Sequence, residues 1–180
     1  MSSVDIQSGD LLWQTPTQSS AIYENSFSLK NSDLISENYS IYFSNNKNEF
    51  FALDERTGNI KWKQTLNSNL RPTYADGLVF TVTLEGYLVV IDSRNGNIVR
   101  MTNIFEQIKK YKKNNIKPEG FIVARDEIYL SLNNGKLIII DIKTGKSKNI
   151  LKIDNGKISR PYVLNNNMYI VRDNSIIKLN

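Results

Sequence analysis

A short hairpin signature recurs along this chain and constrains its fold more than any other feature. Each copy contains a turn of the form Asp-x-x-x-Gly followed by a strand, as in residues 53–62 (LDERTGNIKW). The Asp side chain can accept hydrogen bonds from backbone N–H groups, and the Gly supplies the positive φ that closes a tight turn. The turn residues are Asp5 and Gly9, Asp54 and Gly58, Asp92 and Gly96, and Asp141 and Gly145. These residues are therefore predicted to serve folding rather than catalysis.

The spacing of the signature predicts four strands in each repeat. Its Asp returns every 38 to 49 residues, and a further hairpin precedes it, as in residues 73–82, where Asp76 and Gly77 separate two β-branched and aromatic runs. A period near 40 residues with four short strands is typical of propeller blades. We therefore predict an all-β propeller of four repeats, organised as one domain over residues 1–180.

The two ends of the chain are predicted to be complementary parts of a blade. Residues 4–14 contain a turn and its following strand, with no strand expected before Asp5, and residues 175–180 stop where the next turn would start. We expect residues 176–179 to pair with residues 11–14, because unpaired strand edges favour association. The pairing would lie within one molecule if four blades close into a ring, and between molecules if they do not.

Two insertions interrupt the repeat. Residues 15–32 are rich in Ser, Thr and Asn, which predicts a loop with a turn of helix near residues 21–25. Residues 103–118 carry Asn103 and Glu106 at capping-box spacing and apolar residues at helical spacing, which predicts a short amphipathic helix. Its lysines are Lys109, Lys110, Lys112 and Lys113. They serve either the helix C-terminus and solubility or, alternatively, a docking patch for acidic protein or lipid headgroups.

The composition removes most catalytic chemistries. The sequence has no Cys and no His, so thiol nucleophiles, imidazole bases and the usual zinc ligands are absent from it. Its 23 Lys and Arg against 18 Asp and Glu give a net charge of +5, which is too dilute to predict nucleic-acid binding. No apolar run approaches the roughly 20 residues of a membrane span, and the first residues have no export-signal pattern. We expect a soluble chain with no catalytic site, metal site or cofactor.

The repeated segment 52–62 (ALDERTGNIKW) resembles the tryptophan-docking motif of PQQ-type β-propeller repeats. Such repeats occur in quinoprotein dehydrogenases and in BamB-like outer-membrane assembly factors. The resemblance covers the whole chain and implies that the Trp of each fourth strand packs between neighbouring blades. Trp13 and Trp62 keep the motif, whereas Arg100 and Asn149 replace it. We therefore expect weaker docking in the second half of the chain.

Residues 159–179 resemble the terminal blade of BamB-like proteins, which also stop at a third strand. Because those proteins are eight-bladed, the resemblance implies a C-terminal half. The parent would be a lipoprotein scaffold on the periplasmic side of the outer membrane, with the barrel-inserting subunit of the assembly machinery as its partner. A fragment of a quinone-dependent dehydrogenase is disfavoured, because the sequence has no vicinal Cys pair and no recognisable calcium-ligand cluster. A ligand-sensing or structural propeller is the third hypothesis.

The approaches to the first strands carry the predicted partner-binding residues. Arg71 and Arg160 each precede a Pro at equivalent positions of their blades, and Asp33 opens another blade. An Arg beside a stiff turn can form a bidentate contact with a carboxylate, whereas a structural Arg would pair with an acid of a neighbouring blade. We expect Asp33, Arg71 and Arg160 to contact a protein partner, with the four lysines of the second insertion as further candidates.

Overall fold

The computed structural model describes residues 1–17, 31–45, 48–106 and 116–179, and every regular element in these ranges is a β-strand. Three four-stranded antiparallel sheets form the body. The first contains β3 (Ile35–Glu37), β4 (Ser40–Ser44), β5 (Glu49–Asp54) and β6 (Ile60–Thr65), and the second contains β7 (Thr73–Ala75), β8 (Leu78–Val82), β9 (Tyr87–Asp92) and β10 (Ile98–Asn103). The third contains β11 (Pro118–Ala124), β12 (Glu127–Leu132), β13 (Lys136–Asp141) and β14 (Ser147–Lys152). A two-stranded sheet of β1 (Ser2–Val4) and β2 (Leu11–Gln14) precedes them, and a three-stranded sheet of β15 (Tyr162–Leu164), β16 (Asn167–Arg172) and β17 (Ser175–Leu179) follows. The predicted all-β propeller is confirmed.

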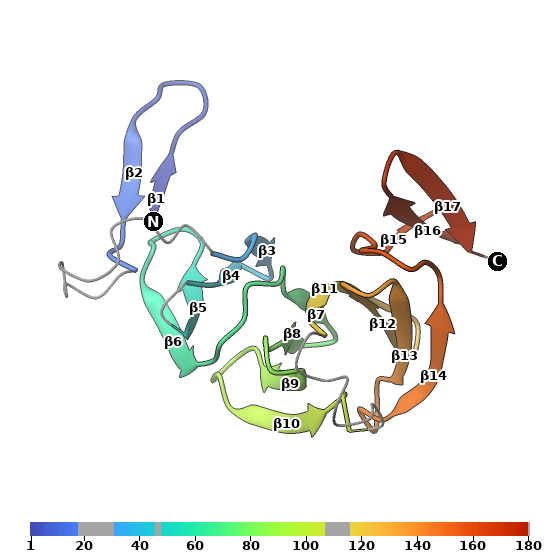
Figure 1. Cartoon of the computed structure of the whole chain (residues 1–180). Coiled ribbons are helices and arrows are strands. Elements are labelled where there is room, and N and C mark those ends of the chain that lie inside the picture. The colour runs from blue at the N-terminus through green and yellow to red at the C-terminus, as the bar shows by residue number, and fades with distance from the viewer. Residues whose placement is uncertain (18–30, 46–47, 107–115, 180) are drawn as a thin grey trace, which may run out of the picture.

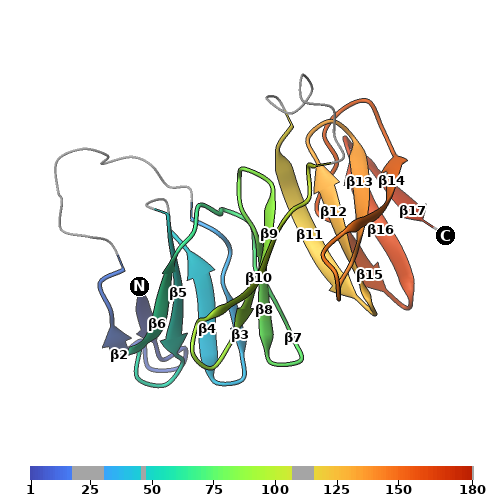
Figure 2. The same ribbon diagram turned by 90° about the horizontal axis from the view of Figure 1, so that it is seen from below.

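The sheets stand side by side along an open arc (Figures 1 and 2). The first strand of each blade lies on the inner side, where β3 contacts β7 and β7 contacts β11, and β6, β10 and β14 form the outer edge (Figure 1). The sheets β1–β2 and β15–β17 lie at opposite ends of the arc, so residues 176–179 and 11–14 do not pair within the described chain. Of the two alternatives, pairing within one molecule is therefore not found in this structure, and pairing between molecules stays a prediction.

Two sequence predictions about local structure need correction or fall outside the described ranges. A strand does precede Asp5, because Ser2, Ser3 and Val4 pair with β2. Backbone pairing needs no apolar side chains, which explains why the sequence, with serines at positions 2 and 3, did not predict this strand. The helix predicted near residues 21–25 lies outside the described residues, as does most of the one predicted over 103–118. At the start of the latter, Asn103 ends β10 and Phe105 is buried.

Apolar side chains of facing sheets interdigitate to form the core. Phe50 and Trp62 of the first four-stranded sheet cluster with Val89 and Ile91 of the second. A larger cluster joins the second and third sheets through residues that include Phe80, Val90, Phe121 and Ile138. Burial of this apolar area between blades, rather than within any one sheet, is the main favourable term in stacking them.

Trp62 fastens the first four-stranded blade to the second. Its ring is 7% exposed, and its indole N–H donates to the backbone oxygen of Ser93 at 2.8 Å. It lies against Gly96, where an added Cβ would come within 2.7 Å of the ring, so only glycine fits this contact. Trp13 repeats the arrangement on the preceding blade, donating to the oxygen of Glu55 at 3.1 Å beside Gly58, whose φ is +72°. The predicted burial of both tryptophans is confirmed.

Arg100 takes over the docking role in the next blade. Its guanidinium donates to the backbone oxygens of Ile142 (2.6 Å) and Lys143, in the turn that ends at Gly145. A docking contact is therefore kept at Arg100, because a guanidinium can satisfy the same turn carbonyls that an indole reaches. Asn149, in contrast, is exposed, and its side-chain oxygen accepts a hydrogen bond from Ile150 N.

The Asp residues of the signature stabilise their turns as predicted. Asp54 Oδ1 accepts from the backbone N–H groups of Arg56 (3.1 Å) and Thr57 (3.0 Å), and hydrogen bonds to backbone and Thr57 lower the pKa of Asp54. In the second blade, the Arg94 side chain reaches back to Asp92 with a 2.7 Å ion pair. This pairing, together with the Arg94 backbone N–H, lowers the pKa of Asp92 to about 2.

Truncation of Trp62 tests its role between blades. Trp62→Ala should lower the free energy of unfolding by about 3–5 kcal/mol, as large core truncations do, because it removes both the ring contact and the Ser93 hydrogen bond. Chemical denaturation measures the change. Trp62→Phe is the control, since it keeps an aromatic ring and should cost less. A loss below about 1 kcal/mol for the Ala variant would mean that the ring is not an important packing element.

Removal of the Arg94 side chain tests the cause of the Asp92 shift. Arg94→Ala should raise the pKa of Asp92 from about 2 toward 3.8, as followed by NMR titration of the carboxyl carbon. Because the folded-state pKa is depressed, the ionised Asp92 stabilises the folded chain above about pH 4. This contribution is lost as the pH falls through about 2. Arg56→Ala, beside Asp54, should leave Asp92 unchanged, and an unshifted Asp92 in Arg94→Ala would contradict the assignment.

Candidate functional site

The predicted partner-binding residues occupy one repeated position on the inner side of the arc. Asp33, Arg71, Gly120 and Arg160 each stand four residues before the last residue of a first strand, namely β3, β7, β11 and β15. Because the first strands are the innermost ones, the fold directs these positions toward the same region (Figure 1). Sequence analysis paired Arg71 with Arg160 but missed Gly120, whose place becomes clear only when the strand ends are known.

A cavity of about 390 Å³, called the inner cleft here, brings Arg71 and Arg160 together. One wall comes from β3 and includes Glu37, and the other from β7 and its approach, with Thr73 and Tyr74. Three blades thus contribute to one cleft, although Arg71 and Arg160 are far apart in sequence.

The Arg160 side chain reaches the inner cleft by crossing Gly120. An added Cβ at Gly120 would lie 2.5 Å from Arg160 Cβ, and Arg160 Nε donates to the oxygen of Phe121 at 2.8 Å. Burial lowers the pKa of Arg160, the positive charge of Arg71 lowers it further, and Asp33 opposes the shift. Asp33 and Arg71 are therefore both near enough to Arg160 to influence its charge.

The inner cleft has unused hydrogen-bonding capacity. The Arg71 guanidinium forms no hydrogen bond or ion pair with other described residues. The buried hydroxyl oxygen of Thr73, which lines the cleft, also has no partner within the described structure. Two arginines that line one cleft suit a carboxylate, which accepts several charge-assisted hydrogen bonds. Thr73 was missed by sequence analysis, because nothing in a strand sequence marks an unpaired hydroxyl.

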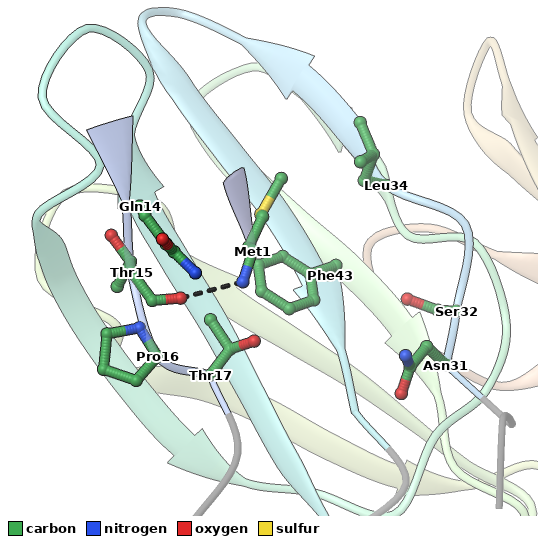
Figure 3. A pocket seen from close by; sticks show the side chains of 9 residues that line it. All are labelled: Met1, Gln14, Thr15, Pro16, Thr17, Asn31, Ser32, Leu34 and Phe43. Atoms are coloured by element: carbon green, nitrogen blue, oxygen red, sulfur yellow. Dashed lines mark hydrogen bonds between the residues drawn. The ribbon is translucent and has the colours of Figure 1, made fainter. Parts of the chain in front are cut away.

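A second cavity, of about 590 Å³, lies where the β1–β2 hairpin meets the β3–β6 sheet (Figure 3). Its lining is mixed, with the apolar side chains of Leu34 and Phe43 beside polar residues such as Gln14 and Ser32. The Met1 amino group closes one side by donating to the oxygen of Thr15 at 2.8 Å (Figure 3). Among the described residues, the Met1 amino group is the one charged group that lines this cavity, and it already donates to Thr15.

Lys109, Lys110, Lys112 and Lys113 lie outside the described ranges. Within those ranges, no cluster of three or more acidic side chains could hold a metal ion. The same ranges contain no helix of the length and apolarity needed to span a bilayer.

Substitution of Gly120 tests the path of Arg160. Gly120→Ala should destabilise the fold by about 1–3 kcal/mol, as overpacking does, because the new methyl group meets Arg160 Cβ and backbone. Thermal or chemical unfolding measures this cost. Gly156→Ala is the matched control, since its nearest neighbour would lie 3.8 Å away. Equal stability of the two variants would contradict the described crossing.

The chain is similar to known proteins in sequence and in fold. The family described as outer membrane protein assembly factor BamB matches residues 1–102. No curated protein matches the chain. Among solved structures, BamB from Moraxella catarrhalis aligns with a TM-score of 0.67 and 14% identity, over 82% of this chain and 41% of that one.

Two further solved structures share the fold. The computationally designed Ika8 protein aligns with a TM-score of 0.72 and 12% identity, over 97% of this chain and 50% of that one. A europium-containing methanol dehydrogenase aligns with a TM-score of 0.53 and 19% identity, over 65% of this chain and 23% of that one. The chain thus spans half or less of the length of these three structures. At such identities the likeness shows the β-propeller fold alone.

Proposed function

We propose that this chain, which belongs to the family described as outer membrane protein assembly factor BamB, is a non-catalytic scaffold that binds another protein. The proposal treats residues 1–180 as one propeller domain and the inner cleft as its docking site. The observation that carries it is that Arg71 and Arg160, from two different blades, line one cavity. Rigid loops on a propeller are well suited to such binding.

The chemistry of the inner cleft supports an acidic contact on the partner. A Glu or Asp side chain can accept hydrogen bonds from the guanidinium groups of Arg71 and Arg160, and it relieves the repulsion between the two arginines. Glu37, on the β3 wall of the cleft, can select a basic residue next to that acid, or repel a second acid. Charge-assisted hydrogen bonds of this kind contribute about 1.5–3 kcal/mol each.

Membership of the BamB family supports a specific partner and place. The partner is the barrel-inserting subunit of the outer-membrane assembly machinery, which presents a soluble periplasmic domain. The parent protein acts on the periplasmic side of the outer membrane, attached by a lipid anchor. These assignments rest on the family, and the residues of the inner cleft are the ones proposed to make the contact.

Charge reversal in the inner cleft tests the proposal. The double variant Arg71→Glu and Arg160→Glu should weaken binding to the soluble domain of the barrel-inserting subunit by roughly 10- to 100-fold, the loss of one or two charge-assisted contacts. Surface plasmon resonance or a pull-down measures it. Arg56→Glu with Arg125→Glu is the matched control, because both arginines are exposed and lie outside the cleft. Circular dichroism should show the same β-sheet content in all variants.

Two outcomes would contradict the proposal. Undiminished binding by the folded double variant would remove these arginines from the site. Turnover of an alcohol after addition of quinone and calcium would favour a dehydrogenase fragment, the reading suggested by the likeness to the methanol dehydrogenase.

A further inference from the structure

The sheets at the two ends of the arc are complementary parts of one blade. The sheet β15–β17 supplies first, second and third strands, and within the described residues β17 pairs only with β16. The strand β2 corresponds to a fourth strand, since its Trp13 docks as Trp62 of β6 does. We propose that a second copy of this chain completes the blade, with β2 of one copy pairing with β17 of the other.

The sheet β15–β17 presents an apolar face at the end of the arc. Tyr162 pairs with Tyr169, and Val171 pairs with Ile176, so each pair shares one face of the sheet. Tyr162, Val171 and Ile176 are all exposed, Ile176 by 67%. Such a cluster on an end blade matches the apolar faces that the other blades bury against their neighbours, and it marks an interaction surface.

The opposite end of the arc offers a surface for that face. The β1–β2 hairpin covers part of the β3–β6 sheet through Trp13 and Met1. Beside the hairpin, Leu34 is half exposed and lines the open cavity of Figure 3 together with Phe43. The cavity borders the face of β4 that carries Phe43, and β15 and β16 of a second copy would pack against this face.

The strand β1 is a weak competitor for β17. Only Ser2, Ser3 and Val4 pair with β2, with an irregularity between Ser3 and Val4. The strand β17 is longer and contains two isoleucines and a leucine, which favour strand pairing. Displacement of β1 by β17 therefore exchanges a short strand of small polar residues for a longer apolar one.

The register of the exchanged strand follows from β5 and β6. There Phe51 pairs with Lys63, Ala52 with Trp62 and Leu53 with Ile60. By equivalence, Ile177 pairs with Gln14, Lys178 with Trp13 and Leu179 with Leu11. Ile177 and Leu179 then stay on the face toward β11–β14, where Leu179 already lines a cavity with Leu137.

The shape of the arc indicates that β17 pairs with β2 of a second copy and not with β2 of its own chain. Its two end sheets lie on opposite sides of the opening (Figure 1). The arc also superposes on half of the Ika8 chain with a TM-score of 0.72. Two such arcs related by a two-fold axis bring each β2 to the other's β17 and form a closed ring, which leaves neither edge unpaired.

Engineered cysteines test the pairing directly, because the sequence has no Cys of its own. Gln14→Cys with Ile177→Cys places two thiols on paired positions. Mild oxidation should give a covalent dimer of twice 20.6 kDa on a non-reducing gel. Leu12→Cys with Ile177→Cys is the out-of-register control and should crosslink poorly. Light scattering of the unmodified protein should show the same dimer mass.

A surface substitution checks the apolar face without altering the strands. Ile176→Asp should weaken the dimer by about tenfold or more, because it buries an unpaired charge at the contact. Ile6→Asp is its control, since Ile6 is 98% exposed at the hairpin tip. A monomer at all concentrations would overturn the proposal. So would a disulfide formed within one chain, which would indicate that four blades close on themselves.

Discussion

Docking of a fourth-strand side chain on the glycine turn of the next blade is the contact on which the arrangement of blades depends. Trp13, Trp62 and Arg100 all donate to backbone oxygens of such a turn. The glycine is required because a Cβ would enter the space of the docked side chain, as it would at Gly96. Indole and guanidinium meet the same need, since each offers N–H donors on a flat group. The turn therefore selects a geometry and a donor rather than one residue type.

This outer contact also determines what happens on the inner side of the arc. Once neighbouring sheets are fixed at their outer edges, their first strands converge, and equivalent positions of different blades come close. Arg160 can then cross Gly120 and approach Arg71, although the three residues belong to three blades. The inner cleft thus combines side chains from distant parts of the sequence on one frame, and a preorganised frame lowers the entropy cost of binding at such a site.

The parts of this structure that were predictable from sequence are those with local causes. The Asp and Gly turns follow from hydrogen bonds and φ angles within five residues, and the burial of Trp13 and Trp62 follows from their place in the repeat. The docking of Arg100 was missed, because a sequence shows the loss of Trp but not which carbonyls its replacement reaches. Strand β1 was missed because backbone pairing alone stabilises it.

The candidate site was predictable in outline for the same reason. Arg71 and Arg160 share a local pattern with the following Pro, so their equivalence was visible, and Asp33 fell at the same place in its blade. The equivalence of Gly120 to Arg71 and Arg160 depends on its distance in sequence from the last residue of β11, and the structure is needed to locate that residue. The Thr73 hydroxyl has no hydrogen-bond partner among the described residues, and a sequence pattern does not show which hydroxyl groups lack a partner.

Hydrogen–deuterium exchange with and without the partner's soluble domain tests the central claim most directly, namely that the inner cleft is the docking site. The account predicts slower exchange on binding for the inner segments 33–37, 71–75 and 160–164. Exchange at the outer strands β10 and β14 should be unchanged. Protection confined to β10 and β14, with none at the inner segments, would contradict it.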